Sequence, residues 1–236
     1  MQTDGVRDMV PALFWVAATV SLGFSVILFV RYQARRSPFY FWWAISFVLS
    51  ALTYGSEAST VSQGWTLPWY HVYIMASAGL VGAMSVGTGY LAFARPMARG
   101  YAVGIGLVGI GLLISTCFSP MSVIGNWLTL NAGVGGITGV ARIAYVATAS
   151  VGGTMVVVGA LWSWWKSRRH CTLLIAVGAT ASGVGGSLAP QEVVLSVLPV
   201  MNIVGLFLML AGYLFAVPNP WRLPREREDG RDGQPS

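Results

Sequence analysis

The chain has 236 residues, of which 55% are hydrophobic and only 9% are charged. A soluble domain carries about 25% charged residues, so this composition excludes a water-exposed globular protein, and its apolar content excludes a disordered chain. The two cysteines, Cys117 and Cys171, are too few for a disulfide framework or a multi-cysteine metal cluster, and a polytopic membrane protein remains.

Seven apolar runs are each long enough to cross a hydrocarbon core of about 30 Å, which takes roughly 20 helical residues. They lack the alternation over about ten positions that a membrane strand requires. In chain order, the predicted spans are 9–30, 39–60, 69–94, 100–118, 143–165, 171–189 and 193–217. We therefore predict an all-α membrane protein with one seven-helix transmembrane domain over residues 1–217. Residues 218–236 are predicted to form a short, disordered cytoplasmic tail.

The placement of basic residues predicts the orientation of these spans. Twelve of the 14 lysines and arginines lie at one set of span ends, and the opposite set carries only Arg7 and Arg142. Positive charge favours the cytoplasmic side, so the N-terminus is predicted outside and the C-terminus inside, in the inner (plasma) membrane. The expected partners are the lipid bilayer and an unidentified small molecule or membrane protein. Nucleic-acid binding is not expected, and a homo-oligomer stays open.

Repeated motifs predict that the domain is a parallel duplication of three helices, joined by a fourth, in a 3+1+3 plan. The third and seventh spans end in Gly-Tyr-Leu, at Gly89–Leu91 and Gly212–Leu214, each followed by a proline. The second and sixth spans share Gly-Ser at Gly55 and Gly186. Each triplet starts on the same side of the membrane, so the two triplets are parallel repeats.

This plan resembles the transporter–opsin class, which includes sugar-exporting, PQ-loop and vitamin transporters and microbial rhodopsins. The resemblance is carried by Trp42–Leu49 through Glu57, Gly64-Trp65 and Gly87–Leu91. These stretches also resemble segments of bacterial seven-helix membrane proteins. The resemblance implies a fold more than an activity. Retinal proteins need a lysine in the last helix, whereas the single lysine, Lys166, ends the fifth span. A retinal-bound function is therefore not expected.

Glu57 is the most informative candidate for chemistry, because an acid inside a span must be solvated, paired or neutralised. It lies near the outer end of the second span, and His71, at the start of the third, is its expected partner. Arg142 could join them. Two interpretations stay open: a polar vestibule that binds a substrate or passes protons, and a structural ion pair that ties three helices together. The ligand- or proton-binding candidates are Glu57, His71, Tyr54, Tyr73, Arg142 and Asn202.

Small residues predict where helices approach closely. In the third span they recur every four residues at Gly79, Ala83 and Gly87, and in the sixth span at Gly178, Ser182 and Gly186. The fourth span contains Gly104-Ile105-Gly106-Leu107-Val108-Gly109, which matches a dinucleotide-binding motif but follows no strand, so we interpret it as helix packing.

Two further segments carry predictions. In the seventh span, Asn202 follows Pro199 and either satisfies a carbonyl that the proline frees or borders a central site. The outer segment 119–140 is predicted to be interfacial or partly re-entrant.

No catalytic residue, cofactor or metal site is predicted, because no acids, histidines or cysteines cluster with ligand spacing and the two histidines fall on opposite sides. The favoured function is binding or transport of a small solute in a cavity between the two triplets, and a link to proton movement stays open. The alternative is a sensor or an accessory subunit that transports nothing. An intramembrane lipid enzyme has the least support.

Overall fold

The structure is a computed structural model that describes residues 4–118, 136–168, 170–188 and 197–216. These ranges fold into seven helices, so the predicted all-helical class is confirmed. The predicted tail and most of the segment 119–140 lie outside the described residues. The helices are α1 (Asp4–Arg35), α2 (Pro38–Gln63), α3 (Leu67–Ala92), α4 (Arg95–Phe118), α5 (Gly139–Ser167), α6 (His170–Leu188) and α7 (Val197–Ala216).

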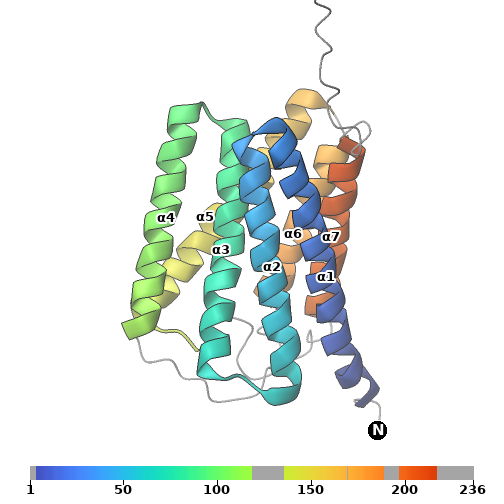
Figure 1. Cartoon of the computed structure of the whole chain (residues 1–236), viewed down its shortest axis with the longest axis vertical. Coiled ribbons are helices and arrows are strands. Elements are labelled where there is room, and N and C mark those ends of the chain that lie inside the picture. Colours follow the sequence, from blue (N-terminus) through green and yellow to red (C-terminus); the bar gives the residue numbers. More distant parts are fainter. Residues whose placement is uncertain (1–3, 119–135, 169, 189–196, 217–236) are drawn as a thin grey trace, which may run out of the picture.

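Short turns join the first four helices as antiparallel neighbours (Figure 1). Pro38 and Pro68 lie in the first turns of α2 and α3, where the missing N–H of proline has no partner within the helix to lose. Gly64 ends α2 with a φ of +76°, a left-handed conformation that glycine adopts without steric cost. The chain therefore runs up and down between two ends, which we call the lower end, where α1 begins, and the upper end.

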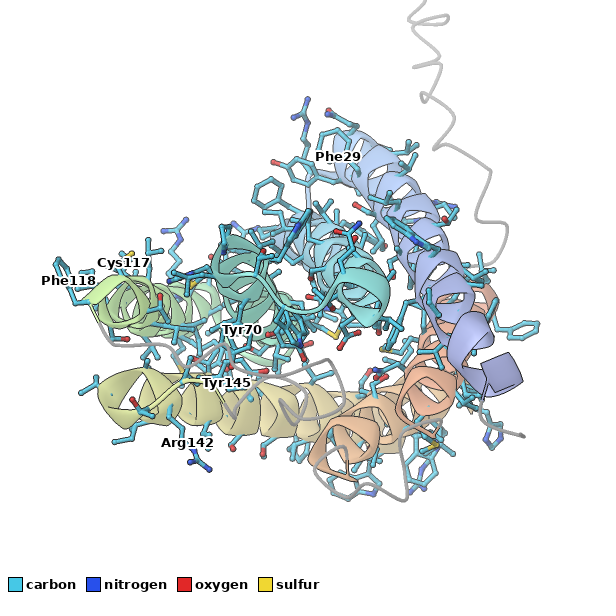
Figure 2. All side chains as sticks on the ribbon, turned by 90° about the horizontal axis from the view of Figure 1, so that it is seen from below. Phe29, Tyr70, Cys117, Phe118, Arg142 and Tyr145 are labelled. Carbon is cyan, nitrogen blue, oxygen red and sulfur yellow. The ribbon has the colours of Figure 1, made fainter. Side chains whose placement is uncertain are left out.

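Six of the helices form a ring, in the order α1, α2, α3, α5, α6 and α7, which the contact between α7 and α1 closes. The helix α4 packs against α3 and α5 from outside this ring, as the view along the bundle shows (Figure 2). Its buried residues are only Ala98, Leu112 and Thr116. Most of the α4 surface is therefore open to whatever surrounds the protein.

Two hydrophobic clusters fill the interior, one toward each end. The lower core includes Phe14, Trp65, Tyr70, Tyr73, Ile74, Leu112 and Ile137. The upper core includes Phe24, Leu28, Trp43, Phe47, Met84, Leu206, Met209 and Tyr213. Tyr54 packs against both clusters, so α2 links the two halves of the interior.

Four of the helices are long and apolar enough to cross a membrane: Val10–Arg35, Leu67–Ala92, Arg95–Phe118 and Gly139–Trp165. Shorter apolar stretches lie at Leu173–Ser182 and Val200–Phe215. Large apolar side chains on these helices face outward, with Val103, Leu107 and Ile143 all more than 60% exposed. In water such a surface would be costly, so the helices indicate a membrane protein.

Close approach of α6 and α7 takes place at glycines, as the spacing of small residues predicted for the sixth span. A Cβ at Gly178 would lie 2.5 Å from the carbonyl oxygen of Gly205, and a Cβ at Gly212 would lie 2.6 Å from that of Cys171. In the third span, a Cβ at Gly87 would collide with the ring of Trp43 on α2. Backbones at these points touch directly, which adds dispersion contacts where lipid offers no hydrophobic driving force.

The packing interpretation of the glycines in α4 is wrong. A Cβ at Gly104, Gly106 or Gly109 would meet no atom of the described residues within 4 Å. The physical reason is the position of α4 outside the ring, where its one buried edge is made of Ala98, Leu112 and Thr116 rather than glycines.

In α7, Pro199 lies in the first turn of the described helix, where a proline removes no intrahelical hydrogen bond. The carbonyl that it would free belongs to residue 195, which is outside the described range, so the role of Asn202 beside it stays a prediction.

A matched pair of glycine substitutions tests the packing of the ring. We expect Gly178→Ala to lower the free energy of unfolding by about 1–3 kcal/mol, because the new methyl group meets the backbone of α7. Gly109→Ala should leave stability unchanged or raise it by up to about 1 kcal/mol, since its Cβ enters open space and alanine favours the helix. Unfolding in mixed micelles with increasing SDS measures both, and equal losses would contradict the arrangement.

Candidate functional site

Glu57 lies on α2, toward the lower end of the bundle, and its side chain is only 3% exposed. Its neighbours on the helix are Tyr54, which stacks on Phe14 of α1 with ring centroids 6.4 Å apart, and Ala58 in the lower core. The carboxyl group is therefore surrounded by aromatic and apolar side chains from several helices. Burial of an acid in such a setting is expensive unless each oxygen is satisfied.

Tyrosines supply the polar contacts of Glu57. The hydroxyl of Tyr73 on α3 is a hydrogen-bond partner of the carboxyl group. Tyr54 and Tyr145 lie near enough to interact with it electrostatically. The second oxygen, Oε2, is buried and has no hydrogen-bond partner among the described residues. The site therefore holds one acidic oxygen whose hydrogen-bonding capacity is unused.

A separate hydroxyl contact joins α3 to α5 near this site. The hydroxyl of Tyr145 donates a hydrogen bond to Oγ of Ser77 at 3.2 Å. Figure 2 shows Tyr145 and Tyr70 between α3 and α5. Glu57 on α2, Tyr73 and Ser77 on α3 and Tyr145 on α5 thus form polar contacts between α2 and α3 and between α3 and α5.

Aromatic rings close the lower end beside Glu57. Trp65, in the turn between α2 and α3, packs against two tyrosines. Its ring centroid lies 5.0 Å from that of Tyr73 and 5.4 Å from that of Tyr70, and the planes of Trp65 and Tyr70 meet at 80°. The hydroxyl of the fully buried Tyr70 accepts a hydrogen bond of 2.9 Å from the N–H of Gly136, ahead of α5. A Cβ at Gly136 would lie 2.7 Å from that hydroxyl oxygen, so glycine permits this contact.

The predicted grouping of Glu57, His71 and Arg142 is wrong. The Nδ1 atom of His71 lies 2.9 Å from the carbonyl oxygen of Leu67, and its Nε2 atom lies 3.2 Å from that of Thr116 on α4. The side chain of Arg142 is exposed and points away from the bundle (Figure 2).

The physical reason for this difference is helical geometry. Residues two positions apart point about 200° apart around a helix, so Tyr73 faces Glu57 while His71 faces α4. His71 thus ties α3 to α4, and the partner of Glu57 is a tyrosine rather than a cation. Whether His71 or Arg142 binds a ligand stays a prediction.

The remaining predicted residues are spread over the fold. Tyr54 and Tyr73 both belong to the surroundings of Glu57. Asn202 is half-buried near the start of α7. Cys117 is exposed at the lower end of α4, and Cys171 is half-buried at the upper end of α6, so the two thiols are at opposite ends. Within the described ranges, no three histidines, cysteines or acids gather where they could hold a metal ion.

A row of buried hydroxyl groups on α2 was not predicted. Most of them donate to carbonyls one turn earlier in the same helix: Ser50 to Ser46, Thr53 to Leu49, Ser56 to Leu52 and Thr60 to Glu57, at 2.8–3.0 Å. Ser46 instead donates to Leu80 of α3 at 2.8 Å, and Ser25 of α1 to Ala44 at 2.8 Å. The spacing of three and four residues along α2 was the signal that predicts such a buried face.

A second feature lies toward the upper end, where a pocket of about 250 Å³ opens between α2, α3, α5 and α6. Aromatic rings of Phe39, Trp43 and Trp162 line it, together with the hydroxyl-bearing Thr88 and Ser163 and several aliphatic or small side chains. The Nε1 atom of Trp43 is buried and has no hydrogen-bond partner among the described residues. This pocket and the Glu57 site occupy opposite halves of the bundle.

Comparisons with models of known protein families, with curated proteins and with solved structures give no match to this chain. The resemblance to the transporter–opsin class therefore stays a prediction from sequence motifs.

Infrared spectroscopy can identify the partner of Glu57. We expect one carboxylic C=O band, measured at a pH where the group is protonated, to disappear in Glu57→Gln and to move to higher frequency in Tyr73→Phe, because the hydrogen bond is lost. The band should keep its position in His71→Ala and Arg142→Ala. A shift in the His71 variant alone would contradict the assignment.

Proposed function

We propose that the protein spans the membrane seven times, with its lower end outside and its upper end in the cytoplasm. Basic residues support this orientation. The upper ends of the helices carry Arg31, Arg35, Arg36, Arg95, Arg99 and Arg168, whereas Arg142 is at the lower end. Positive charge at one end is the arrangement that positive-inside insertion favours.

We also propose that α1–α3 and α5–α7 are parallel repeats related by a half-turn about the axis of the bundle. The neighbours of each helix support this relation. The pairs α1·α2 and α2·α3 correspond to α5·α6 and α6·α7, and the contact of α3 with α5 corresponds to that of α7 with α1. In such repeats the space between the triplets is where transporters bind their solutes.

The function that this arrangement supports best is proton-linked transport of a small solute, with Glu57 as the group that takes up and releases the proton. The observation that carries this proposal is the deeply buried Glu57 carboxyl group, whose Oε2 atom has no partner in the described part of the chain. An ionisable side chain inside a span is costly, and its retention there favours a function.

The two ends of the bundle support the same mechanism. The upper pocket lies between helices of the two triplets and offers room for a solute. The lower end is filled beside Glu57 by the rings of Trp65, Tyr70 and Tyr73. A solute site open toward one side and packed toward the other is what alternating access requires of one of its states. Protonation of Glu57 would then alter the polar contacts of Tyr73 at the closed end.

A second candidate function is a ligand sensor that transports nothing, and one observation favours it. Most hydroxyl groups on α2 donate to carbonyls of their own helix, so few of these donors are free to bind a solute or water. A protein that only recognises a ligand needs no path lined with such donors.

Proteoliposomes loaded with the pH dye pyranine separate the two functions. Neutral solutes, with coumarin as the first probe because the pocket lining is uncharged, are added outside. We expect solute-dependent proton movement in the wild type and in Arg142→Ala, reduced movement in Glu57→Asp, and background in Glu57→Gln, because glutamine cannot exchange a proton. Equal proton movement in the wild type and Glu57→Gln would refute a proton-carrying Glu57. Ligand binding without any proton movement would favour the sensor.

The native cysteines test the orientation. With Cys171→Ser, a membrane-impermeant maleimide should label Cys117 in intact cells, because the lower end of α4 is then outside. With Cys117→Ser, Cys171 should be labelled only after the cells are permeabilised. The reverse pattern would invert the proposed orientation.

A further inference from the structure

We propose that His71 forms a pH-dependent contact between α3 and α4, which is complete only when its imidazole ring carries two protons. This inference goes beyond the proposed transport, because it concerns the attachment of α4 rather than a solute site. The geometry that points to it is a ring whose two nitrogens both face carbonyl oxygens. Nδ1 lies 2.9 Å from the oxygen of Leu67, and Nε2 lies 3.2 Å from that of Thr116 on α4.

The protonation of the ring decides how many of these contacts form. A carbonyl oxygen accepts hydrogen bonds and cannot donate them, so each contact needs a proton on the nitrogen. The imidazolium form has both protons, whereas a neutral ring has one and presents a lone pair at its other nitrogen. Because the contact to Leu67 is shorter and lies within one helix, we expect the neutral ring of His71 to keep its proton on Nδ1. The contact to α4 is then the one that is lost.

The carbonyl of Thr116 has no backbone donor in its own helix. It belongs to the last turn of α4, which ends at Phe118. In a longer helix its partner would be the N–H of residue 120, but this residue is Pro120 and proline has no N–H. The last turn of α4 also contains no basic residue. His71 therefore supplies from α3 both a donor and the positive charge that the C-terminal end of a helix favours.

A different hydrogen bond joins α4 to α3 nearer the upper end. The hydroxyl of Tyr101 donates to Oγ of Ser85 at 3.0 Å. Tyrosine and serine hydroxyls are neutral near pH 7, whereas histidine changes its charge between about pH 5 and pH 8. The buried residues of α4 are few, so side-chain contacts matter for its attachment to the ring. A rise in pH should therefore loosen the lower end of α4 and leave its upper end in place.

The ionisable groups around the lower half of α3 leave the charge of His71 without an acidic partner among the described residues. On α3 and on the helices packed against it, these groups are Tyr54 and Glu57 of α2, Tyr70 and Tyr73 of α3, Cys117 of α4, and Arg142 and Tyr145 of α5. Glu57 is on the side of α3 that Tyr73 faces, away from His71. Arg142 points away from the bundle (Figure 2). Carbonyl dipoles are thus the groups that favour the charged ring.

Hydrogen–deuterium exchange of the full chain in nanodiscs, measured by mass spectrometry, tests the proposal. Rates in the last turn of α4 are corrected for the intrinsic effect of pH on amide exchange. In the wild type we expect the protection of this turn to fall about three- to tenfold between about pH 5.5 and pH 8, because a hydrogen bond and the charge at the helix end are lost. His71→Gln should show no such change, because glutamine does not titrate in this range.

Two control variants isolate the effect of His71. The other histidine, His170, begins α6 at the upper end, so His170→Gln should keep the pH dependence of the wild type. Glu57→Gln should also keep it, which separates this contact from the proposed proton carrier. Both ends of the bundle meet the same pH in nanodiscs, so the result does not depend on the proposed orientation. A pH dependence that persists in His71→Gln, is lost in Glu57→Gln or is absent from the wild type would overturn the proposal.

A second measurement keeps the proposal testable if His71→Gln does not fold. With nitrogen-15-labelled histidine, His170→Gln leaves the ring nitrogens of His71 as the only labelled imidazole in the chain. We expect their NMR signals to show protons on both nitrogens at about pH 5.5 and on Nδ1 alone at about pH 8. A neutral ring at about pH 5.5 would refute the two-proton contact.

Discussion

The buried carboxyl group of Glu57 is the interaction on which the lower half of the bundle depends. An acid with 3% exposure must find its polar contacts within the protein, and here they come from tyrosine hydroxyls on neighbouring helices. Two of the tyrosines near it also pack against aromatic rings, Tyr54 against Phe14 and Tyr73 against Trp65 and Tyr70. Tyrosine side chains thus supply both polar contacts and packing at the site, and they connect α2, α3 and α5.

The same requirement shapes the rest of the interior. Hydroxyl groups on α2 and α3 return to carbonyls of their own helix, so that burying them leaves few orphaned polar atoms. A smaller number of hydroxyls cross to a neighbouring helix, as Ser46 does to Leu80. Where α6 meets α7, glycines bring the backbones into contact. Hydrogen bonds of buried hydroxyl groups therefore stabilise some helix contacts of the ring, and close backbone packing stabilises others.

The two ends of the bundle differ in chemistry as a result. The lower half carries an acid among hydroxyl-bearing aromatic rings, and the upper half carries an apolar pocket with one buried indole donor. In the proposed mechanism, the first takes the proton and the second takes the solute, and α2 connects them because it bears both Glu57 and Trp43. A coupling of the two sites would run along this helix and through Tyr54, which packs against both cores.

Composition and the length of the apolar runs determined by themselves that the chain is helical, because only helices of about 20 residues satisfy their own backbone in lipid. They also located the seven helices and marked Glu57 as unusual. The partner of Glu57 was decided only by tertiary structure. Helical spacing places His71 and Tyr73 on opposite sides of α3, but which of the two sides faces α2 depends on how the helices pack. The sequence likewise did not predict that α4 lies outside the ring, since the spacing of its glycines is the same whether they face a helix or open space. Periodicity reports which residues share a face, whereas the neighbour of that face depends on how all seven helices pack.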